Sequence, residues 1–285
     1  MYRLIAIDMD GTFLNGKHQI SDENIAAVKA AQEKGIKVVI VSGRQHKSIK
    51  EFLNRHGLEC DAVGLNGAEF LDHNGKEIYI QWMEKESIKA VIDLCEGEKA
   101  IYQIYNSEHI ITNELQDPFN EFKKIVKMHN PNAENLLERT EMFYKGIYDG
   151  GIVEKDVLGF LQKEGMGAIK MLILSHDEEK LIRIQERLSQ REDLTVTSSF
   201  RGNLEIFHSN TDKGIALLQI AKELGIKKEE TMAIGDNLND IRMITEAGLG
   251  VAMGNALEAV KQKADFITKT NNENGVAYAI KKFVL

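Results

Sequence analysis

The feature that most constrains this chain is an apolar run, residues 4–7, that ends abruptly in Asp8-Met9-Asp10-Gly11-Thr12. A short uninterrupted apolar run is typical of a strand buried on both faces of a parallel sheet. Because residues two apart in an extended chain point to the same side, the pattern predicts that the carboxylates of Asp8 and Asp10 lie together. Two such charges repel unless one is protonated or a cation binds. We therefore expect either a metal site at a strand end or a polar turn after a core strand.

The same unit of strand, polar end and helix recurs along the first 80 residues. Helices are predicted at 21–35 and 47–56, and strands at 36–41 and 62–65. The second strand ends at Ser42 and the third at Asn66, so each strand is followed by a polar group. This alternation predicts an α/β fold, a doubly wound parallel sheet of the Rossmann-like kind.

The alternation stops in the middle of the chain and resumes later. A hairpin is expected at 69–81, and from about residue 84 strands and helices follow without the parallel pattern. We expect residues 84–196 to form an inserted α+β cap domain, and residues 1–83 with 197–285 to form the core. In the resumed pattern, strands are predicted at 203–207, 231–234 and 249–252, and helices from about residue 211 and at 275–283.

Composition narrows the possible partners and compartment. The net charge of −8 argues against a dedicated nucleic-acid binder, because phosphate backbones require basic surface. Cys60 and Cys95 form neither a CxxC pair nor a disulfide framework, which favours reduced thiols. No apolar run approaches the roughly 18 residues of a membrane span, and no basic leader precedes the first strand. We expect a cytoplasmic protein without nucleic-acid or membrane partners; its state as monomer or homodimer is open.

The polar groups at the strand ends complement one another chemically. Because strand ends of a parallel sheet share one edge, Asp8, Asp10, Ser42 and Asn66 are expected near the acidic pair of a later strand end, Asp236 and Asp240. Carboxylates without Cys or His favour Mg²⁺ over zinc, and Mg²⁺ attracts phosphate. The Ser42 hydroxyl and the Lys213 ammonium can hold phosphoryl oxygens.

Lys213 lies in the first turn of a predicted helix, where the helix dipole disfavours a cation. A nearby anion would explain it; a solvated lysine is the alternative. A carboxylate can attack phosphorus to give an aspartyl-phosphate, and a second acid must then protonate the leaving alcohol and activate water. Asp8 and Asp10 can divide these two roles, with the cation and Lys213 screening the repulsion between nucleophile and phosphate.

These residues resemble the four motifs of the haloacid dehalogenase (HAD) superfamily, in order, spacing and strand context. The motifs are Asp8-Met9-Asp10-Gly11-Thr12, Ser42-Gly43-Arg44, Lys213 and Gly235-Asp236-Asn237-Leu238-Asn239-Asp240. In detail the chain resembles the Cof-type sugar phosphatases with a subclass IIB cap, including Asn66-Gly67, Val251-Ala252-Met253-Gly254-Asn255 and Asn274-Gly275-Val276-Ala277. The position of the insertion, between the second and third motifs, matches that subclass.

The resemblance implies a role for each matching residue. Asp8 would be the nucleophile and Asp10 the general acid/base, with Lys213 as the third catalytic residue. The substrate phosphate would be held by residues of the motif loops, namely Thr12, Ser42, Gly43, Asn66 and Asn239. Mg²⁺ would be bound by Asp8, the main-chain carbonyl of Asp10 and Asp236, and Asp240 would support its water shell or Lys213.

The expected function is Mg²⁺-dependent hydrolysis of small phosphorylated metabolites, and of sugar phosphates in particular. A phosphomutase of the same capped subclass, or a non-catalytic ligand-binding module, are the alternatives. Arg44 either approaches the phosphate or caps a helix, and the structural role is favoured. In the cap, Tyr105, Asn106, Tyr144, Lys145 and Lys170 either contact the leaving group or belong to the cap core and surface.

Overall fold

The computed structural model describes residues 1–115, 117–129, 134–148, 151–198 and 200–285 and divides the chain into two compact units. The core unit comprises Met1–Ile80 and Thr211–Leu285, and the cap unit comprises Gln81–Asn210. The cap unit begins three residues before the predicted insertion and ends fourteen after it (81 against 84, and 210 against 196).

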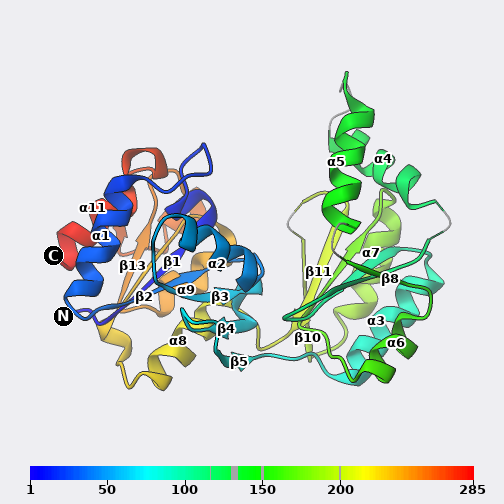
Figure 1. The fold of residues 1–285 in the computed structure, drawn as a ribbon, viewed down its shortest axis with the longest axis horizontal. Helices are drawn as coiled ribbons and strands as arrows, with labels where there is room; N and C mark the ends of the chain where they lie inside the picture. The colour runs from blue at the N-terminus through cyan, green and yellow to red at the C-terminus, as the bar shows by residue number, and fades with distance from the viewer. Residues whose placement is uncertain (116, 130–133, 149–150, 199) are drawn as a thin grey trace. The chain divides into compact units, whose positions relative to one another are not determined.

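The core unit is built on an eight-stranded sheet (Figure 1), which agrees with the predicted α/β class. Six neighbouring strands are parallel, and the predicted hairpin adds two antiparallel strands at one edge. In spatial order the strands are β14 (Phe266–Ile267), β13 (Leu249–Ala252), β12 (Thr231–Gly235), β1 (Leu4–Asp8), β2 (Lys37–Val41), β3 (Asp61–Gly64), β4 (Glu69–Leu71) and β5 (Glu77–Ile80).

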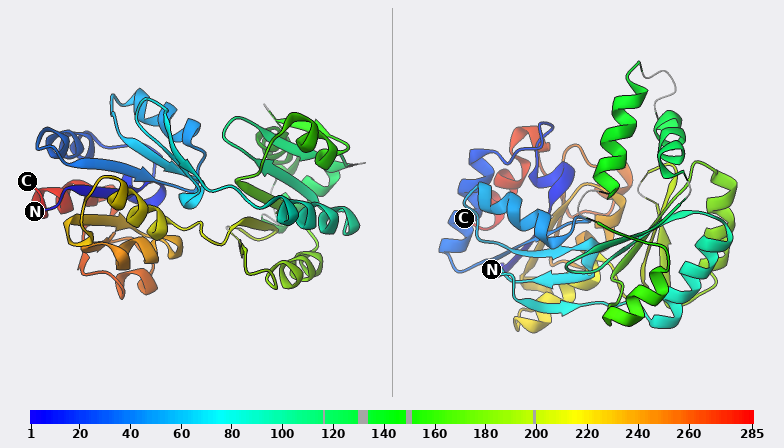
Figure 2. Two further views of the ribbon diagram at one scale, coloured as in Figure 1. Left: turned by 90° about the horizontal axis from the view of Figure 1, so that it is seen from below. Right: turned by 45° about the vertical axis from the view of Figure 1, so that its right-hand side comes forward.

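Both faces of this sheet are covered, as Figure 2 shows for the core unit, which explains the continuous apolar runs. On β1, Ile5 and Ile7 pack into one hydrophobic cluster, and Leu4 and Ala6 pack into another. The first cluster includes side chains of α1, α2 and α11, and the second includes side chains of α8 and α9. These helices are α1 (Asp22–Glu33), α2 (His46–Arg55), α8 (Lys213–Glu223), α9 (Ile241–Glu246) and α11 (Gly275–Phe283), with the short α10 (Glu258–Lys261) before β14.

The sheet order brings the polar strand ends together. The neighbours β12, β1, β2 and β3 run parallel, so the loops after them leave from the same edge. These loops carry the first, second and fourth motifs and Asn66, with short helical turns at η1 (Met9–Phe13), η2 (Leu65–Gly67) and η4 (Leu238–Asp240), whereas the third motif, Lys213, opens α8. Further turns are η3 (Lys228–Glu230) and η5 (Asn271–Glu273).

The cap unit contains a six-stranded sheet that is antiparallel except for one parallel pair, β7 with β8. In spatial order its strands are β10 (Leu194–Thr197), β11 (Asn203–His208), β9 (Lys170–Leu174), β6 (Ile101–Tyr105), β7 (Ile110–Asn113) and β8 (Ile152–Glu154). Side chains of α3, α6 and α7 pack on one face, and side chains of α4 and α5 pack on the other. These helices are α3 (Lys85–Gly97), α4 (Pro118–His129), α5 (Leu136–Tyr148), α6 (Val157–Glu164) and α7 (Glu178–Leu188).

One strand assignment is wrong. The strand at 203–207 was predicted to resume the parallel core, but β11 pairs antiparallel with β9 and β10 in the cap unit. The run Leu204-Glu205-Ile206-Phe207 has the alternation of a cap strand: Leu204 and Ile206 pack toward α3 and α7, and Glu205 faces the other side. A strand pattern fixes local conformation but not the sheet that the strand joins.

None of the helices in the described part of the chain combines the length and the apolar character that crossing a bilayer requires.

Candidate active site

The first motif leaves the sheet sharply at Asp8. Strand β1 ends at Asp8, and the next residues form the tight turn η1, in which Gly11 has a φ of +85°. A Cβ on Gly11 would lie 2.4 Å from Asp236 Oδ2, so only glycine lets this turn approach the loop after β12. The side chain of Asp8 is 7% exposed and that of Asp10 is 46% exposed. The two carboxylates therefore occupy different environments.

Lys213 is the buried cation of the site. It is the first residue of α8, as predicted, and its side chain is 2% exposed. Its Nζ donates to Asp8 Oδ1 at 2.6 Å and to Asp240 Oδ1 at 2.5 Å. Burial would lower the pKa of Lys213, but the two carboxylates outweigh burial and raise this pKa above its ordinary value. Anions next to the first turn of α8 thus explain a cation at that position.

Three carboxylates meet around this lysine. One oxygen from each of Asp8, Asp236 and Asp240 lies within 4.8 Å of the others. Burial raises the pKa of Asp8 well above its usual range, and the Asp240 carboxylate raises it further against the opposing effect of Lys213. Burial and the Asp240 charge also raise the pKa of Asp236, although the Thr12 hydroxyl, which donates to Asp236 Oδ1 at 2.7 Å, opposes this. The group holds more negative charge than one lysine neutralises.

This surplus fits a hard divalent cation. Among the described residues, no hydrogen bond reaches the buried Asp8 Oδ2. The donor set contains only carboxylate oxygens, which suits Mg²⁺ rather than zinc. Asp240 has other partners, since its Oδ1 accepts from Lys213 and its Oδ2 from the main-chain N–H groups of Asp236 and Asn237. The residues free to bind an ion are therefore Asp8 and Asp236.

Asp10 lies outside the group of three. Arg44 donates through Nε to Asp10 Oδ2 at 2.8 Å and through a terminal nitrogen to Asp10 Oδ1 at 2.6 Å. This bidentate pair holds the carboxylate away from the buried acids. The expectation that Asp8 and Asp10 lie together assumed extended backbone through both residues, but the strand ends at Asp8.

The predicted phosphate-binding residues lie on adjoining loops. Ser42 is buried, and its Oγ accepts from the Arg44 N–H at 3.2 Å. Asn66 adopts φ +59° and donates through its main-chain N–H to the Ser42 carbonyl at 2.9 Å. The Asn239 amide donates to Asn66 Oδ1 at 3.1 Å, and a Cβ on Gly43 would lie 3.1 Å from the same oxygen. These contacts connect the second motif, the loop after β3 and the fourth motif.

Sequence reasoning missed two supporting residues. Arg44 was expected either to approach the phosphate or to cap a helix, with the structural role favoured, whereas it binds Asp10, the predicted acid/base. Asn255 donates to the Gly11 carbonyl at 2.8 Å and accepts from the Asn271 N–H, so it fixes the turn after Asp8. The position of Asn255 after the strand at 249–252 was the available signal.

Comparisons with known proteins identify the family of this chain. The sequence profile of the haloacid dehalogenase-like hydrolases matches residues 5–280. Phosphatase YwpJ of Bacillus subtilis (strain 168) is 37% identical over 98% of this chain and 99% of its own length. The match thus extends over both units.

Two solved structures are also similar. A haloacid dehalogenase-like hydrolase from B. subtilis has a TM-score of 0.80 and 34% identity, covering 99% of this chain and 100% of its own. A HAD subclass IIB sugar phosphatase has a TM-score of 0.73 and 25% identity, covering 99% of this chain and 98% of its own.

Proposed function

This chain belongs to the haloacid dehalogenase-like hydrolases, in their Cof-type subclass IIB branch, and is a phosphatase; we propose that it is a Mg²⁺-dependent phosphomonoesterase for small phosphorylated metabolites of the sugar type. The observation that carries the proposal is the carboxylate Asp8, which Lys213 holds by Oδ1 while Oδ2 receives no hydrogen bond from the described residues. An oriented carboxylate with one oxygen free is what attack on phosphorus requires. The sugar-phosphatase neighbour supports the substrate class.

In the proposed reaction, the Asp8 carboxylate attacks phosphorus and the ester P–O bond breaks, giving an aspartyl-phosphate. Asp10 protonates the departing alkoxide and then takes a proton from the water that hydrolyses this intermediate. The bidentate contact with Arg44 orients the Asp10 carboxylate. Mg²⁺, bound by Asp8, the Asp10 carbonyl and Asp236, would offset the repulsion between carboxylate and phosphate.

Lys213 and Asp240 have linked positioning roles in this proposal. Lys213 holds Asp8 and is available to a phosphoryl oxygen, and Asp240 fixes both Lys213 and the loop of Asp236. We assign the phosphate contacts to Thr12, Ser42, Gly43, Asn66 and Asn239. A direct bond from Asp240 to the metal stays a prediction, as does cytoplasmic location.

The test is phosphate release from p-nitrophenyl phosphate and from a panel of sugar phosphates. We expect turnover with Mg²⁺, and loss of turnover with EDTA and in Asp8→Asn. The matched control is Asp93→Asn, the same substitution at an exposed residue of α3, which should keep full activity. Equal release under all conditions would contradict the proposal.

The phosphomutase alternative predicts a different product. Incubation of a hexose phosphate, followed by ³¹P NMR, should give inorganic phosphate if the enzyme is a hydrolase. An isomeric phosphate ester would instead identify a mutase with the same nucleophile. In either case, acid quenching and mass spectrometry should find one phosphoryl group on the peptide that contains Asp8.

A further inference from the structure

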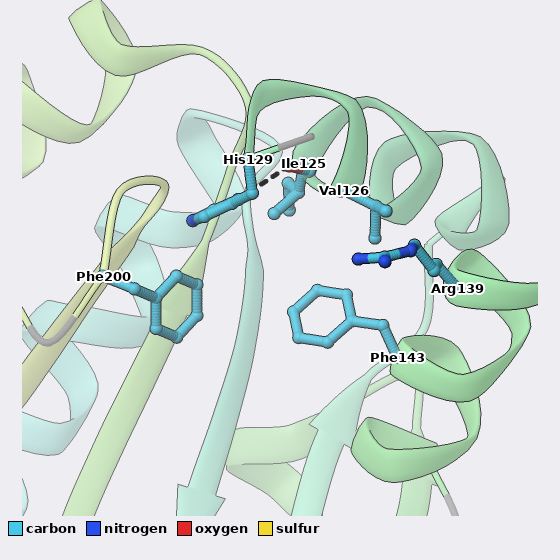
Figure 3. Close-up of a pocket in the computed structure, with 6 residues that line it drawn as sticks. All are labelled: Ile125, Val126, His129, Arg139, Phe143 and Phe200. Carbon is cyan, nitrogen blue, oxygen red and sulfur yellow. Dashed lines mark hydrogen bonds between the residues drawn. The ribbon is translucent and has the colours of Figure 1, made fainter. Parts of the chain in front are cut away.

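The cap unit contains a cavity of about 370 Å³ between α4, α5 and Phe200, which precedes β11 (Figure 3). This volume is within the range of about 300–1,000 Å³ that small-molecule sites occupy. The side chains around it come from three separate elements, and they are Ile125, Val126, His129, Arg139, Phe143 and Phe200.

The floor and walls of the cavity are apolar side chains, several of which contact one another. Ile125 and Val126 are buried, and the Phe143 and Phe200 rings meet edge to face with centroids 6.4 Å apart. The His129 ring contacts the Phe200 ring at 5.6 Å between centroids. Aromatic edges and branched aliphatic groups arranged in this way suit a flat apolar ring system.

Two side chains that line the cavity are polar, the Arg139 guanidinium and the His129 imidazole. In Figure 3 the Arg139 guanidinium extends from α5 between Val126 and Phe143 toward the cavity. Its Nε donates to Asn135 Oδ1 at 2.9 Å, and no carboxylate of the described residues lies within ion-pair distance of its guanidinium. The His129 Nδ1–H donates to the Ile125 carbonyl at 2.9 Å, which fixes that ring.

The absence of an acidic partner at Arg139 differs from the other arginines with resolved contacts in the cap unit. Arg183 pairs with Glu98, Arg191 with Asp193 and Arg201 with Glu178. In a chain of net charge −8, a guanidinium beside an apolar cavity and without a carboxylate is available to an anionic ligand. Its planar fork matches the two oxygens of a carboxylate.

We propose that this cavity is a binding site for a small amphipathic anion, a flat aromatic ring system that carries one carboxylate. The ring occupies the space between Phe143, Phe200 and Val126, and the carboxylate binds Arg139. The site goes beyond the proposed phosphatase function, because it lies within the cap unit and uses none of the residues assigned to phosphate or metal.

The experiment is a ligand-detected NMR titration of the full-length protein with naphthalene-2-carboxylate. We expect a Kd on the order of 1 mM or tighter for this ligand of modest size. Naphthalene-2-carboxamide has nearly the same shape without the charge, and it should bind at least about fivefold more weakly. Absence of carboxylate binding up to about 10 mM, or equal binding of the two compounds, would overturn the proposal.

Three variants test the location. Arg139→Gln should weaken carboxylate binding by about fivefold or more and leave carboxamide binding unchanged. Val126→Phe places a ring in the cavity and should abolish binding of both compounds. The matched control Arg187→Gln removes an exposed arginine of α7 and should bind like the wild type. An equal loss in Arg187→Gln and Arg139→Gln, or full binding to folded Val126→Phe, would refute the site.

Binding is also separable from catalysis. The titration should be unchanged by EDTA, by saturating orthovanadate and in Asp8→Asn, so it can succeed even if the proposed phosphatase mechanism fails. Competition with orthovanadate would place the ligand at the phosphate site and overturn the proposal. Self-association that depends on Val126 and disappears in Val126→Phe would instead identify the cavity as a contact between two copies, and would likewise overturn it.

Discussion

A buried lysine pairs with carboxylates in each unit, and the two sites differ in their charge balance. In the core unit, Lys213 contacts Asp8 and Asp240, and Asp236 adds a third carboxylate. In the cap unit, Lys170 lies 3.0 Å from Glu205 and 5.5 and 5.4 Å from the ring centroids of Tyr105 and Phe207. Both lysines are nearly inaccessible, with side chains 2% and 9% exposed.

The difference in charge balance distinguishes a functional site from a structural ion pair. Lys170 meets one carboxylate of the described residues, and two aromatic rings add cation–π attraction of about 0.5–2 kcal/mol each. The core group instead has excess negative charge, which adds to the larger effect of burial in raising the pKa of Asp8 and Asp236. Buried excess charge costs stability unless a ligand neutralises it. The charge balance, rather than burial, therefore indicates where chemistry occurs.

The largest expected effect comes from replacing each lysine. Lys213→Met should lower kcat for p-nitrophenyl phosphate by about 10³-fold or more, because the nucleophile and phosphate lose their shared cation. Lys170→Met should leave kcat within about threefold of the wild type. Each variant should lose about 3–5 kcal/mol of unfolding free energy, since each leaves a buried carboxylate without its ammonium. Urea denaturation and steady-state kinetics check both, and comparable kcat losses in the two variants would contradict the comparison.

Metal binding should stabilise one unit and not the other. Mg²⁺ at about 100 times its Kd adds about 2.7 kcal/mol to the free energy of unfolding of the unit that contains its site. We expect slower hydrogen exchange in β1 and β12 after Mg²⁺ addition and unchanged exchange in β9 and β11. The Asp236→Asn variant should lose this response, whereas Asp93→Asn should retain it. Equal Mg²⁺ protection of the cap strands would refute the assignment of the surplus charge to the core unit.

Replacing the arginine of one arginine–carboxylate ion pair in each unit should give a smaller difference in kcat. Arg44 binds Asp10 and Arg183 binds Glu98, each through two nitrogens. A lysine cannot reproduce the bidentate contact. Arg44→Lys should therefore lower kcat by roughly tenfold, the effect of about 1.4 kcal/mol on the barrier, while Arg183→Lys should leave kcat unchanged. A loss confined to kcat would place the effect on Asp10; a change in KM alone would exclude it.

Much of the core unit could be predicted because the residues that determine each of its elements lie close together in the sequence. Buried runs, caps such as Ser21, and the motif residues at strand ends are contiguous in sequence, and parallel strand order then brings Asp8, Asp236, Asp240 and Lys213 together. The contact of Arg44 with Asp10 depended on the exact turn at η1, and a strand pattern does not specify that turn.

The cap unit was harder to predict for physical reasons. The alternating pattern indicated that β11 is a strand, but its assignment to the cap sheet required its partners, β9 and β10. Lys170 had two open interpretations; its burial against Glu205 supports the cap-core alternative. The cavity beside Arg139 arises from three elements that no single motif connects.

The smallest expected effect compares the pH dependence of one carboxylate in each unit. Burial raises the pKa of Asp8, so without Mg²⁺ its contribution to stability is fully present below its unfolded pKa of about 3.9 and is lost as pH rises through the folded pKa. Burial acts in the same direction on Glu121, but hydrogen bonds from the main chain and ring of His176 outweigh it and lower the pKa of Glu121. The contribution of Glu121 is therefore present above about pH 4.3 and is lost as pH falls through the folded pKa.

Urea denaturation in EDTA at pH 3 to 8 can separate these opposite signs, because Trp82, the single tryptophan, lies in the cap unit. Glu121→Gln should cost about 1 kcal/mol by Trp82 fluorescence at pH 7 and nothing near pH 3. Asp8→Asn should stabilise the core unit at pH 7, and this gain in stability should vanish toward pH 3. Hydrogen exchange in β1, corrected for the intrinsic exchange rate at each pH, measures it. The comparison would be contradicted if both substitutions changed the free energy of unfolding in the same direction as pH rises. It requires that only the core unit become more stable when a carboxylate is replaced by an amide.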